Sequence, residues 1–233
     1  MTNCRVTGKK DIAEHIPVLW KPLSEGQREY LLAHIELRKF RKDEAIYNEN
    51  DTPRYFMCLI EGKVKVYKDG ASGRQIVRIV QETAFFGYRA ACAEGRYLTG
   101  ASAFEDSLVC LIPVDVVRKL MLENSTMAMY FLKQLAKGLG EADTLMVNLT
   151  QKHIRGRLAE SLLLLRDRYG VAEDGVTLNA RLSREDLANM SNMTTGNAIR
   201  TLSAFASEGI VGVEGRKISI KSESGLRSVS DMG

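Results

Sequence analysis

The chain has 233 residues, of which 45% are hydrophobic and 27% are charged, and its formal net charge is +4. This length can hold two domains, each with its own core, and the small positive charge permits a polyanionic partner without requiring one. No hydrophobic run approaches the length of a membrane span, and the N-terminal residues lack the apolar block of a secretory signal. We therefore expect a cytoplasmic protein.

The cysteines give no sign of a disulfide framework or a zinc site. Cys4, Cys58, Cys92 and Cys110 lie far apart in the sequence, and none belongs to a C-x-x-C pair. We expect free thiols, three of them packed in strands.

The first half of the chain reads as a short helix followed by a β domain. Residues 17–35 predict a lead-in and a helix that Ser24 caps. From Leu37 to Pro113, runs of four to eight residues rich in Val, Ile, Tyr and Phe alternate with turn residues. Within these runs Lys63–Lys68 alternates valine with lysine, as a strand with one solvent-exposed face does. Repeated short strands of this kind predict a sandwich or a barrel.

The block that follows Phe86 breaks this pattern with small residues. Ala90–Ala93 lie between Gly87 and Gly95. They predict either a short helix with free amides across the mouth of the barrel, which would create a concave site, or a plain connecting loop. The residues alone do not decide between the two.

Residues 124–149 have the spacing of a coiled-coil seam, with apolar residues at alternating steps of four and three. A narrow seam of this kind favours a parallel homodimer, although a core helix under a sheet would have a similar stripe. The seam positions are Ala128, Leu132, Leu135, Leu139, Ala142, Met146 and Leu149.

After Leu149 the apolar phase shifts, which predicts a hinge over Thr150–His153 and a second helix that ends at Gly170. Ser183 then begins a capping-box pattern, and Asn192 stands where a tight turn between two helices needs a left-handed residue.

Thr194 caps the second of these helices, which ends at Gly209. The period-two residues around Glu214-Gly215-Arg216 predict a hairpin wing. Two short helices with a wing are typical of a helix-turn-helix that presents its second helix to the DNA major groove, although a plain corner between helices would look similar. Beyond Lys221 the serine-rich tail is expected to be frayed.

This order of elements resembles the cyclic-AMP receptor and fumarate-nitrate regulator (Crp/Fnr) family of bacterial transcription factors over about residues 17–221. The motifs that carry the resemblance are Ile60-Glu61-Gly62-Lys63-Val64, Phe86-Gly87, Glu105-Asp106-Ser107, Arg155-Gly156-Arg157-Leu158-Ala159 and Leu182-Ser183-Arg184-Glu185-Asp186-Leu187-Ala188. The resemblance implies an α+β protein with a jelly-roll sensor domain (residues 1–123), a dimerisation helix (124–150) and a winged helix-turn-helix (151–233). It also implies a homodimer that binds a palindromic DNA operator, with RNA polymerase as a further partner.

The sensor pocket departs from the cyclic-nucleotide pattern of the family. Tyr88 replaces the glutamate that contacts the ribose, Leu98 replaces the arginine that pairs with the phosphate, and Thr99 replaces a serine. A buried phosphate without a cation is costly, so we do not expect cyclic AMP to bind, although Arg89 or Arg96 could supply a charge from another direction. The expected pocket residues are Gly87, Tyr88, Arg89, Leu98, Thr99, Ala142 and Asp143, the last two replacing a Thr-Ser pair.

Other sensor chemistries of the family also match poorly. An iron-sulfur cluster would need several N-terminal cysteines, and only Cys4 lies in that region. Haem remains an option, but His15, His34 and His153 each read as surface or hinge residues. The effector is left open, and a chain regulated only by its abundance is an alternative.

The DNA-reading helix carries Thr195-Gly196 where many family members have an Arg-Glu pair, whereas the later arginine is kept as Arg200. Arg200 is the candidate for a bidentate contact to guanine. The full set of expected DNA contacts is Ser183, Thr194, Thr195, Gly196, Asn197, Arg200 and Arg216, of which Ser183, Thr194 and Arg216 match phosphate-contacting positions of the family.

The unusual Thr195-Gly196 pair leaves a second interpretation open. In it the chain is a metabolite- or haem-sensing module that signals through protein contacts, and its helix-turn-helix is only an interaction surface. An enzyme is the least favoured class, because no His, Cys or carboxylate cluster has catalytic spacing.

Overall fold

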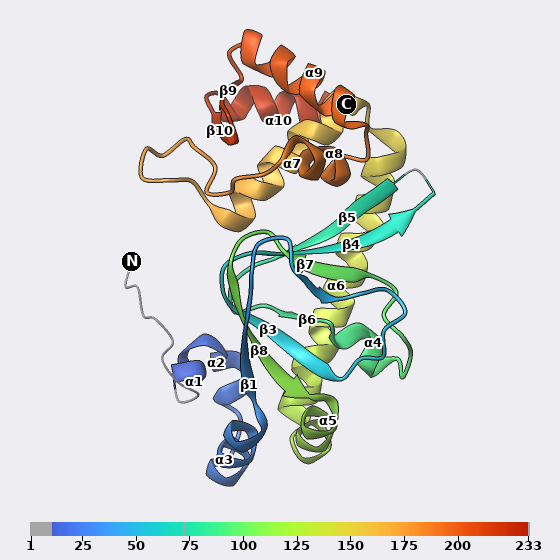
Figure 1. Cartoon of the computed structure of the whole chain (residues 1–233), viewed down its shortest axis with the longest axis vertical. Coiled ribbons are helices and arrows are strands. Elements are labelled where there is room, and N and C mark those ends of the chain that lie inside the picture. The colour runs from blue at the N-terminus through green and yellow to red at the C-terminus, as the bar shows by residue number, and fades with distance from the viewer. Residues whose placement is uncertain (1–10, 72, 233) are drawn as a thin grey trace. The chain divides into compact units, whose positions relative to one another are not determined.

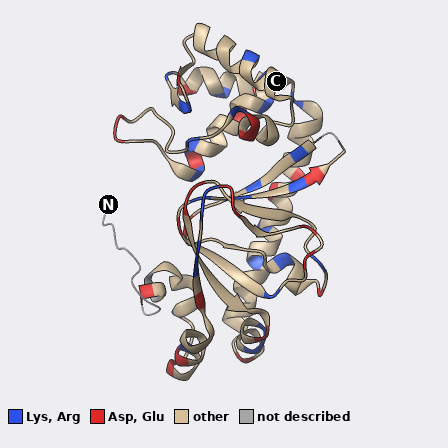
Figure 2. Cartoon of the chain, viewed as in Figure 1, with Lys and Arg blue, Asp and Glu red and all other residues tan. Residues whose placement is uncertain are grey.

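The computed structural model describes residues 11–71 and 73–232 (Figure 1). Their contacts divide the chain into two compact units. The first runs to Lys68 and resumes over Arg78–Leu139, and the second consists of Asp69–Val77 and the residues from Gly140 onward. This division falls inside the helix predicted over 124–149, so the boundaries expected at 123 and 150 stay a prediction. Basic and acidic residues are interspersed over both units (Figure 2), and within the described residues no helix has the length and hydrophobicity that a bilayer crossing requires.

The first unit begins with three short helices, α1 (Ile12–His15), α2 (Pro17–Trp20) and α3 (Glu25–His34). The cap predicted at Ser24 is present as a full capping box, because Ser24 Oγ accepts a hydrogen bond from Gln27 N and the Gln27 side chain accepts one from Ser24 N. Leu19 and Leu31 are fully buried, so these helices cover the β domain rather than extend into solvent.

Two antiparallel four-stranded sheets form the β domain. The first has the order β1 (Glu36–Phe40), β8 (Ser107–Pro113), β3 (Tyr55–Glu61) and β6 (Phe85–Phe86). The second has the order β2 (Ala45–Tyr47), β7 (Gly100–Ala103), β4 (Val64–Gly70) and β5 (Gly73–Val80). Strands far apart in the sequence pair in each sheet, which is the jelly-roll arrangement, and the expected fold class is confirmed.

Alternating residues of β3 and β8 point into two separate cores. Met57 and Leu111 belong to the cluster between the two sheets, whereas Phe56 and Ile112 belong to a cluster on the outer face of the first sheet. This outer cluster also contains residues of α3, α5 (Val114–Glu123) and α6 (Ser125–Gln151), the long helix that runs beside the sheets in Figure 1.

The cysteines follow this pattern only in part. Cys58 and Cys110 lie opposite each other on β3 and β8, and both are fully buried thiols that form no disulfide. Burial raises the pKa of the Cys58 thiol, so it stays protonated and unreactive. Cys92 is exposed at the end of α4 (Tyr88–Cys92), so the prediction of three thiols in strands was wrong for this residue. Cys4 lies outside the described residues.

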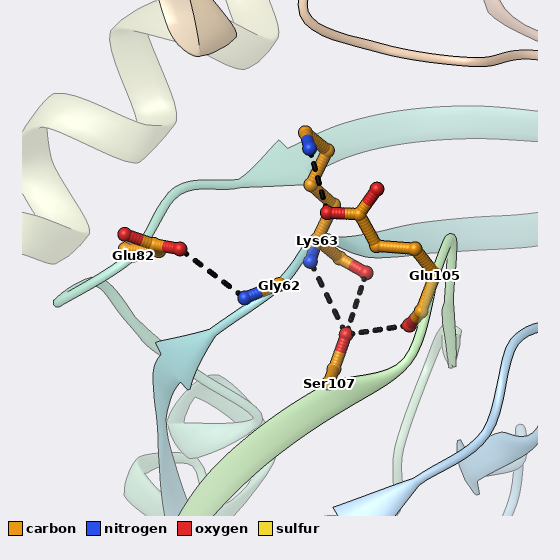
Figure 3. A network of polar contacts seen from close by, with 5 residues as sticks. All are labelled: Gly62, Lys63, Glu82, Glu105 and Ser107. Atoms are coloured by element: carbon orange, nitrogen blue, oxygen red, sulfur yellow. Dashed lines mark hydrogen bonds and ion pairs between the residues drawn. The ribbon is translucent and has the colours of Figure 1, made fainter. Parts of the chain in front are cut away.

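Two of the motifs that carried the family resemblance meet at one corner of the β domain (Figure 3). Ser107 Oγ accepts a hydrogen bond from Lys63 N and lies 3.1 Å from Lys63 O and 2.7 Å from Glu105 O, so its single proton serves one carbonyl at a time. The Lys63 ammonium lies 2.6 Å from the Glu105 carboxylate. Gly62 has φ +93, and a Cβ there would lie 2.5 Å from Ser107 Oγ, so glycine is required. These contacts therefore fix the backbone conformation at this corner of the β domain.

The second unit contains α7 (Ile154–Tyr169), α8 (Arg184–Met190), α9 (Thr195–Ser207), the strands β9 (Val211–Glu214) and β10 (Lys217–Ile220), and α10 (Glu223–Met232). The break between two helices predicted over Thr150–His153 is confirmed, since α6 ends at Gln151 and α7 begins at Ile154, and its role as a hinge stays a prediction. Gly170 ends α7, as expected, with φ +71 and ψ −164, an extended conformation of positive φ that glycine adopts without strain.

The C-terminal tail is a helix, and the prediction of a frayed end was wrong. α10 packs along α7 with Leu226 fully buried, and the Glu223 carboxylate lies 2.7 Å from the Arg166 guanidinium. Ser222 caps its first turn by accepting a hydrogen bond from Gly225 N. The serines that suggested disorder include this cap and the buried Ser230, so a helical face was mistaken for a polar tail.

We predict that Leu226→Ala destabilises the protein by about 2 to 5 kcal/mol, because it opens a cavity between α10 and α7. Chemical denaturation monitored by circular dichroism measures the change. Met232→Ala, at an exposed position of the same helix, is the control and should change stability by no more than about 0.5 kcal/mol. Equal stabilities for the two variants would mean that α10 contributes nothing to the unit.

Candidate nucleic-acid interface and sensor site

Local hydrogen bonds fix the two helices of the helix-turn-helix. Ser183 Oγ accepts from Asp186 N at 3.0 Å, and the Asp186 carboxylate accepts from Ser183 N at 3.2 Å, which completes the predicted capping box of α8. Asn192 has φ +48 in the turn, as predicted. Thr194 Oγ1 accepts from Asn197 N and caps α9. The start of α9 is therefore set by short-range signals.

The two faces of α9 differ in character. Ala198, Leu202 and Phe205 are buried against the rest of the unit. No acidic residue lies between the caps of α9, which is free of the acidic colour in Figure 2. The exposed residues of the helix, which form its outward face, are Thr195, Gly196, Ile199, Arg200, Ser203 and Ser207.

Arg200 is held along this outward face by its neighbours on the helix. Its guanidinium donates a hydrogen bond to the Asn197 side chain. Its Nη1 lies 3.9 Å from where a Cβ of Gly196 would stand, which is an ordinary van der Waals distance. Asn197, expected as a DNA contact, thus also orients Arg200.

The predicted wing is present as a hairpin in which Glu214 pairs with Lys217 across a two-residue turn. Gly215 occupies the first turn position with φ +57, which glycine adopts without strain. Arg216, the second turn residue, is exposed at the tip. Arg184 Nη2 donates to Gly215 O at 2.8 Å and so ties the wing to the start of α8. Arg184 was part of a recognised motif, but its anchoring role could not be inferred because Gly215 is 31 residues away.

An ion pair fixes the far end of α9. Both Nη nitrogens of the Arg155 guanidinium contact the Glu208 carboxylate, at 2.8 and 2.6 Å, and the guanidinium carbon lies 4.9 Å from the centre of the Phe205 ring. The hydrogen bond with Arg155 lowers the pKa of Glu208, and the same contact raises the pKa of Arg155. The pair therefore links the start of α7 to the end of α9 with both charges in place at neutral pH.

The structure places the expected pocket residue Tyr88 in the outer core cluster, not among the side chains between the sheets. Its ring is 1% exposed and lies 5.4 Å from Phe131 of α6, centre to centre. Burial raises the pKa of its hydroxyl, against the lowering effect of the nearby Arg78 and Arg89. Gly87, just before it, has φ +74 and caps α4. The segment that sequence left open as a helix or a loop is thus a short helix.

Two tyrosines that sequence reasoning missed lie between the sheets next to Gly87. The ring centres of Tyr47 and Tyr97 lie 3.9 Å apart, and the Tyr47 ring and the Tyr97 hydroxyl each lie 3.5 Å from where a Cβ of Gly87 would be. Burial raises the pKa of both hydroxyls, and a hydrogen bond with the Thr99 side chain partly opposes this at Tyr47. Their only sequence signal was aromaticity within strand-like runs, which does not distinguish a core from a pocket.

The remaining pocket residues are scattered. The Arg89 guanidinium lies against Gly138 of α6, and Leu98 is 75% exposed. Ala142 and Asp143 belong to the second unit, where both are exposed on α6. Among the described residues no group of three or more His, Cys, Asp or Glu side chains could hold a metal ion.

The long helix α6 has two apolar faces. Met127, Phe131 and Gly138 are buried on one face. Leu132, Leu139 and Met146, seven residues apart, are exposed to 56, 65 and 61% on another. Of the other predicted seam residues, Ala128, Leu135 and Leu149 are half-buried, Leu135 against the outer core cluster, and Ala142 is exposed.

Comparison with protein families accounts for both units. Residues 37–124 match the cyclic nucleotide-binding domain, and residues 156–229 match the Crp-like helix-turn-helix domain. This combination defines a DNA-binding transcription regulator with a sensor domain of the cyclic nucleotide-binding type. The chain belongs to the Crp/Fnr family of these regulators, as the resemblance predicted, and the proteins of this family are regulators rather than enzymes.

Three similar proteins match this chain over most of their own length. The global nitrogen regulator of Synechococcus elongatus is 22% identical over 190 residues, which cover 80% of this chain and 86% of that protein. The CRP-like cAMP-activated global transcriptional regulator of Mycobacterium tuberculosis is 22% identical over 183 residues, covering 78% of this chain and 82% of that one. The structure of FixK2 from Bradyrhizobium japonicum superposes with a TM-score of 0.75 at 27% identity, covering 84% of this chain and 96% of FixK2.

The Arg155–Glu208 pair predicts a pH dependence of stability. Since the pKa of Glu208 is lower in the folded chain than its ordinary value of 4.5, the pair stabilises the fold above that pH and the contribution disappears as the pH falls through the lowered pKa. Glu208→Gln should therefore be less stable than the wild type at pH 7, with the gap closing as the pH falls below the ordinary value and through the lowered pKa. Denaturant unfolding at pH 7 and at a series of lower pH values measures the gap. Glu173→Gln, at an exposed loop position, is the matched control; a gap for Glu208→Gln that is independent of pH would rule out the ion pair as its cause.

Proposed function

We propose that this regulator acts as a homodimer that joins two α6 helices and places two α9 helices on the half-sites of a palindromic operator. The observation that carries the proposal is the exposed apolar line of Leu132, Leu139 and Met146. An exposed stripe at seven-residue spacing is stabilised when a second helix covers it. Two-fold symmetry of the protein then requires half-sites centred about one helical turn of DNA apart.

Within each half-site the proposed contacts have different roles. Arg200 carries the base contact, since it is the basic residue of the outward face of α9, and guanine offers it two acceptors in the major groove. Thr194 and Ser183, at the helix starts, and Arg216, at the wing tip, supply phosphate contacts, and Thr195 and Asn197 complete the surface. Such a regulator acts in the cytoplasm, where the operators and RNA polymerase are.

We also propose that the first unit controls this activity through an effector other than cyclic AMP. Support comes from the polar groups near Gly87, where Arg78 and Arg89 lie close to the hydroxyls of Tyr47 and Tyr88. Arg89 in addition contacts α6 at Gly138, so a change at Arg89 can reach the proposed dimer helix directly.

Replacing the α6 stripe tests the dimer. Leu132→Glu with Leu139→Glu should yield monomers, because each buried leucine contributes about 1.5 to 3 kcal/mol and the glutamates of the two copies repel each other. Light scattering measures the mass. Leu135 is left intact because it packs partly against its own domain, and Leu122→Glu, at an 84% exposed position of α5, is the control that should remain dimeric. A double variant that is still a dimer would place the interface elsewhere.

The DNA contacts are tested by separating base readout from phosphate affinity. Arg200→Ala should weaken binding to the preferred operator by about 1 to 3 kcal/mol and have little effect on random DNA. Arg216→Ala should weaken binding to both and lower the salt dependence by about one counterion in each subunit, because it removes one phosphate contact there. Fluorescence anisotropy at several salt concentrations gives both quantities, with Arg227→Ala on α10 as the control for removal of an exposed charge.

The operator sequence is identified by selecting, from random DNA, the sequences that the purified protein binds, with and without cell extract. Enrichment of a palindrome supports the proposal. If no palindrome is enriched under either condition, operator binding is refuted and the alternative of signalling through protein contacts is favoured.

A further inference from the structure

The outward face of α9 carries an apolar side chain that the proposed contacts do not use. Ile199 is 45% exposed, whereas Leu202 and Phe205 of the same helix are 2 and 0% exposed. A β-branched residue is a weaker helix former than alanine, and exposing it to water gains nothing for folding. Local stability therefore does not explain an isoleucine at this position.

Ile199 lies on the outward face of α9, which the proposed operator binding turns toward the DNA. It follows Gly196 by three residues and Thr195 by four, and precedes Ser203 by four, so small side chains surround it on the same face. It also adjoins Arg200. Two consecutive helical residues differ by 1.5 Å along the axis, less than the rise of one base pair, so both side chains reach the same or neighbouring base pairs.

The size and surroundings of this apolar spot indicate its partner. A protein partner would need a contiguous apolar patch, and Thr195, Gly196, Arg200 and Ser203 around Ile199 are polar or lack a side chain. In the major groove, by contrast, the distinctive apolar group is the C5 methyl of thymine. One isoleucine among small neighbours, beside a guanidinium that can bind guanine, matches a single methyl group next to a base-pair edge.

We propose that Ile199 reads a thymine methyl in the operator, at a base pair within one step of the one that Arg200 contacts. This inference rests on the proposed operator binding and adds a specificity-determining residue to it. Reading is by burial of two apolar groups against each other, and no hydrogen bond or charge is involved. A substitution of Ile199 should accordingly change which DNA sequence is preferred and leave the salt dependence of binding unaltered.

Deoxyuridine gives a direct test, because it differs from thymidine only by the missing C5 methyl. Each thymine of the selected operator is replaced in turn in one half-site, and affinity is measured by fluorescence anisotropy. The affinity of the wild type should fall about fourfold at one position, and about fifteenfold when both half-sites are changed, as expected for one methyl each. Ile199→Ser, which gives the helix a further exposed serine like Ser203, should bind the thymine and uracil operators equally.

Two controls separate this effect from others. Arg200→Ala should still bind the deoxyuridine operator more weakly than the thymidine operator, since the methyl contact is independent of the guanidinium. Val176→Ser, which removes another exposed apolar side chain of the same unit, should behave as the wild type.

The inference is overturned if no thymine position of the operator is sensitive to removal of its methyl, or if Ile199→Ser retains that sensitivity. Both results are obtained on an operator that the protein binds, so they leave operator binding intact. Failure of the proposed function is seen earlier, as the absence of any enriched palindrome.

Discussion

The 27-residue helix α6 imposes the main constraint on this protein, because it must satisfy two apolar surfaces at once. One face belongs to the outer core of the β domain through Met127 and Phe131. Another face, with Leu132, Leu139 and Met146, is exposed in the single chain. This combination of a packed face and an exposed apolar face is the reason why we propose a second copy of the chain as the occupant of the exposed face.

The second constraint in the structure is the fixed position of α9 within its unit. Its start is set by the cap at Thr194, its end by the Arg155–Glu208 pair, and its inner face by burial of Phe205. The wing is tied to α8 through Arg184 and Gly215. With both ends and one face fixed, the outward side chains are presented in one orientation, which is what the base-reading roles that we propose for Arg200 and Ile199 require.

The sensor half keeps the family's framework and changes its chemistry. The shape of the jelly roll is maintained by the contacts among Lys63, Glu105 and Ser107 and by the positive φ of Gly87. Tyr88, however, is part of the packing against α6, and stacked Tyr47 and Tyr97 lie beside Gly87. An effector that binds beside Gly87 would meet these aromatic rings and the guanidinium groups of Arg78 and Arg89.

The sequence by itself determined the features that depend on neighbours a few residues away: the capping boxes at Ser24 and Ser183, the turn at Asn192, the hairpin wing, the break between α6 and α7, and with them the fold class and family. The tertiary structure alone decided the features that depend on packing between distant segments. Tyr88 is buried against Phe131, whereas Leu98 is exposed. Cys58 and Cys110 lie opposite each other on neighbouring strands, and the serine-rich tail forms the helix α10. The tertiary structure also leaves Ile199 outward while its apolar neighbours are buried. A local pattern encodes backbone conformation through hydrogen bonds between near residues, but whether a side chain meets solvent or another side chain is settled only when the chain has folded.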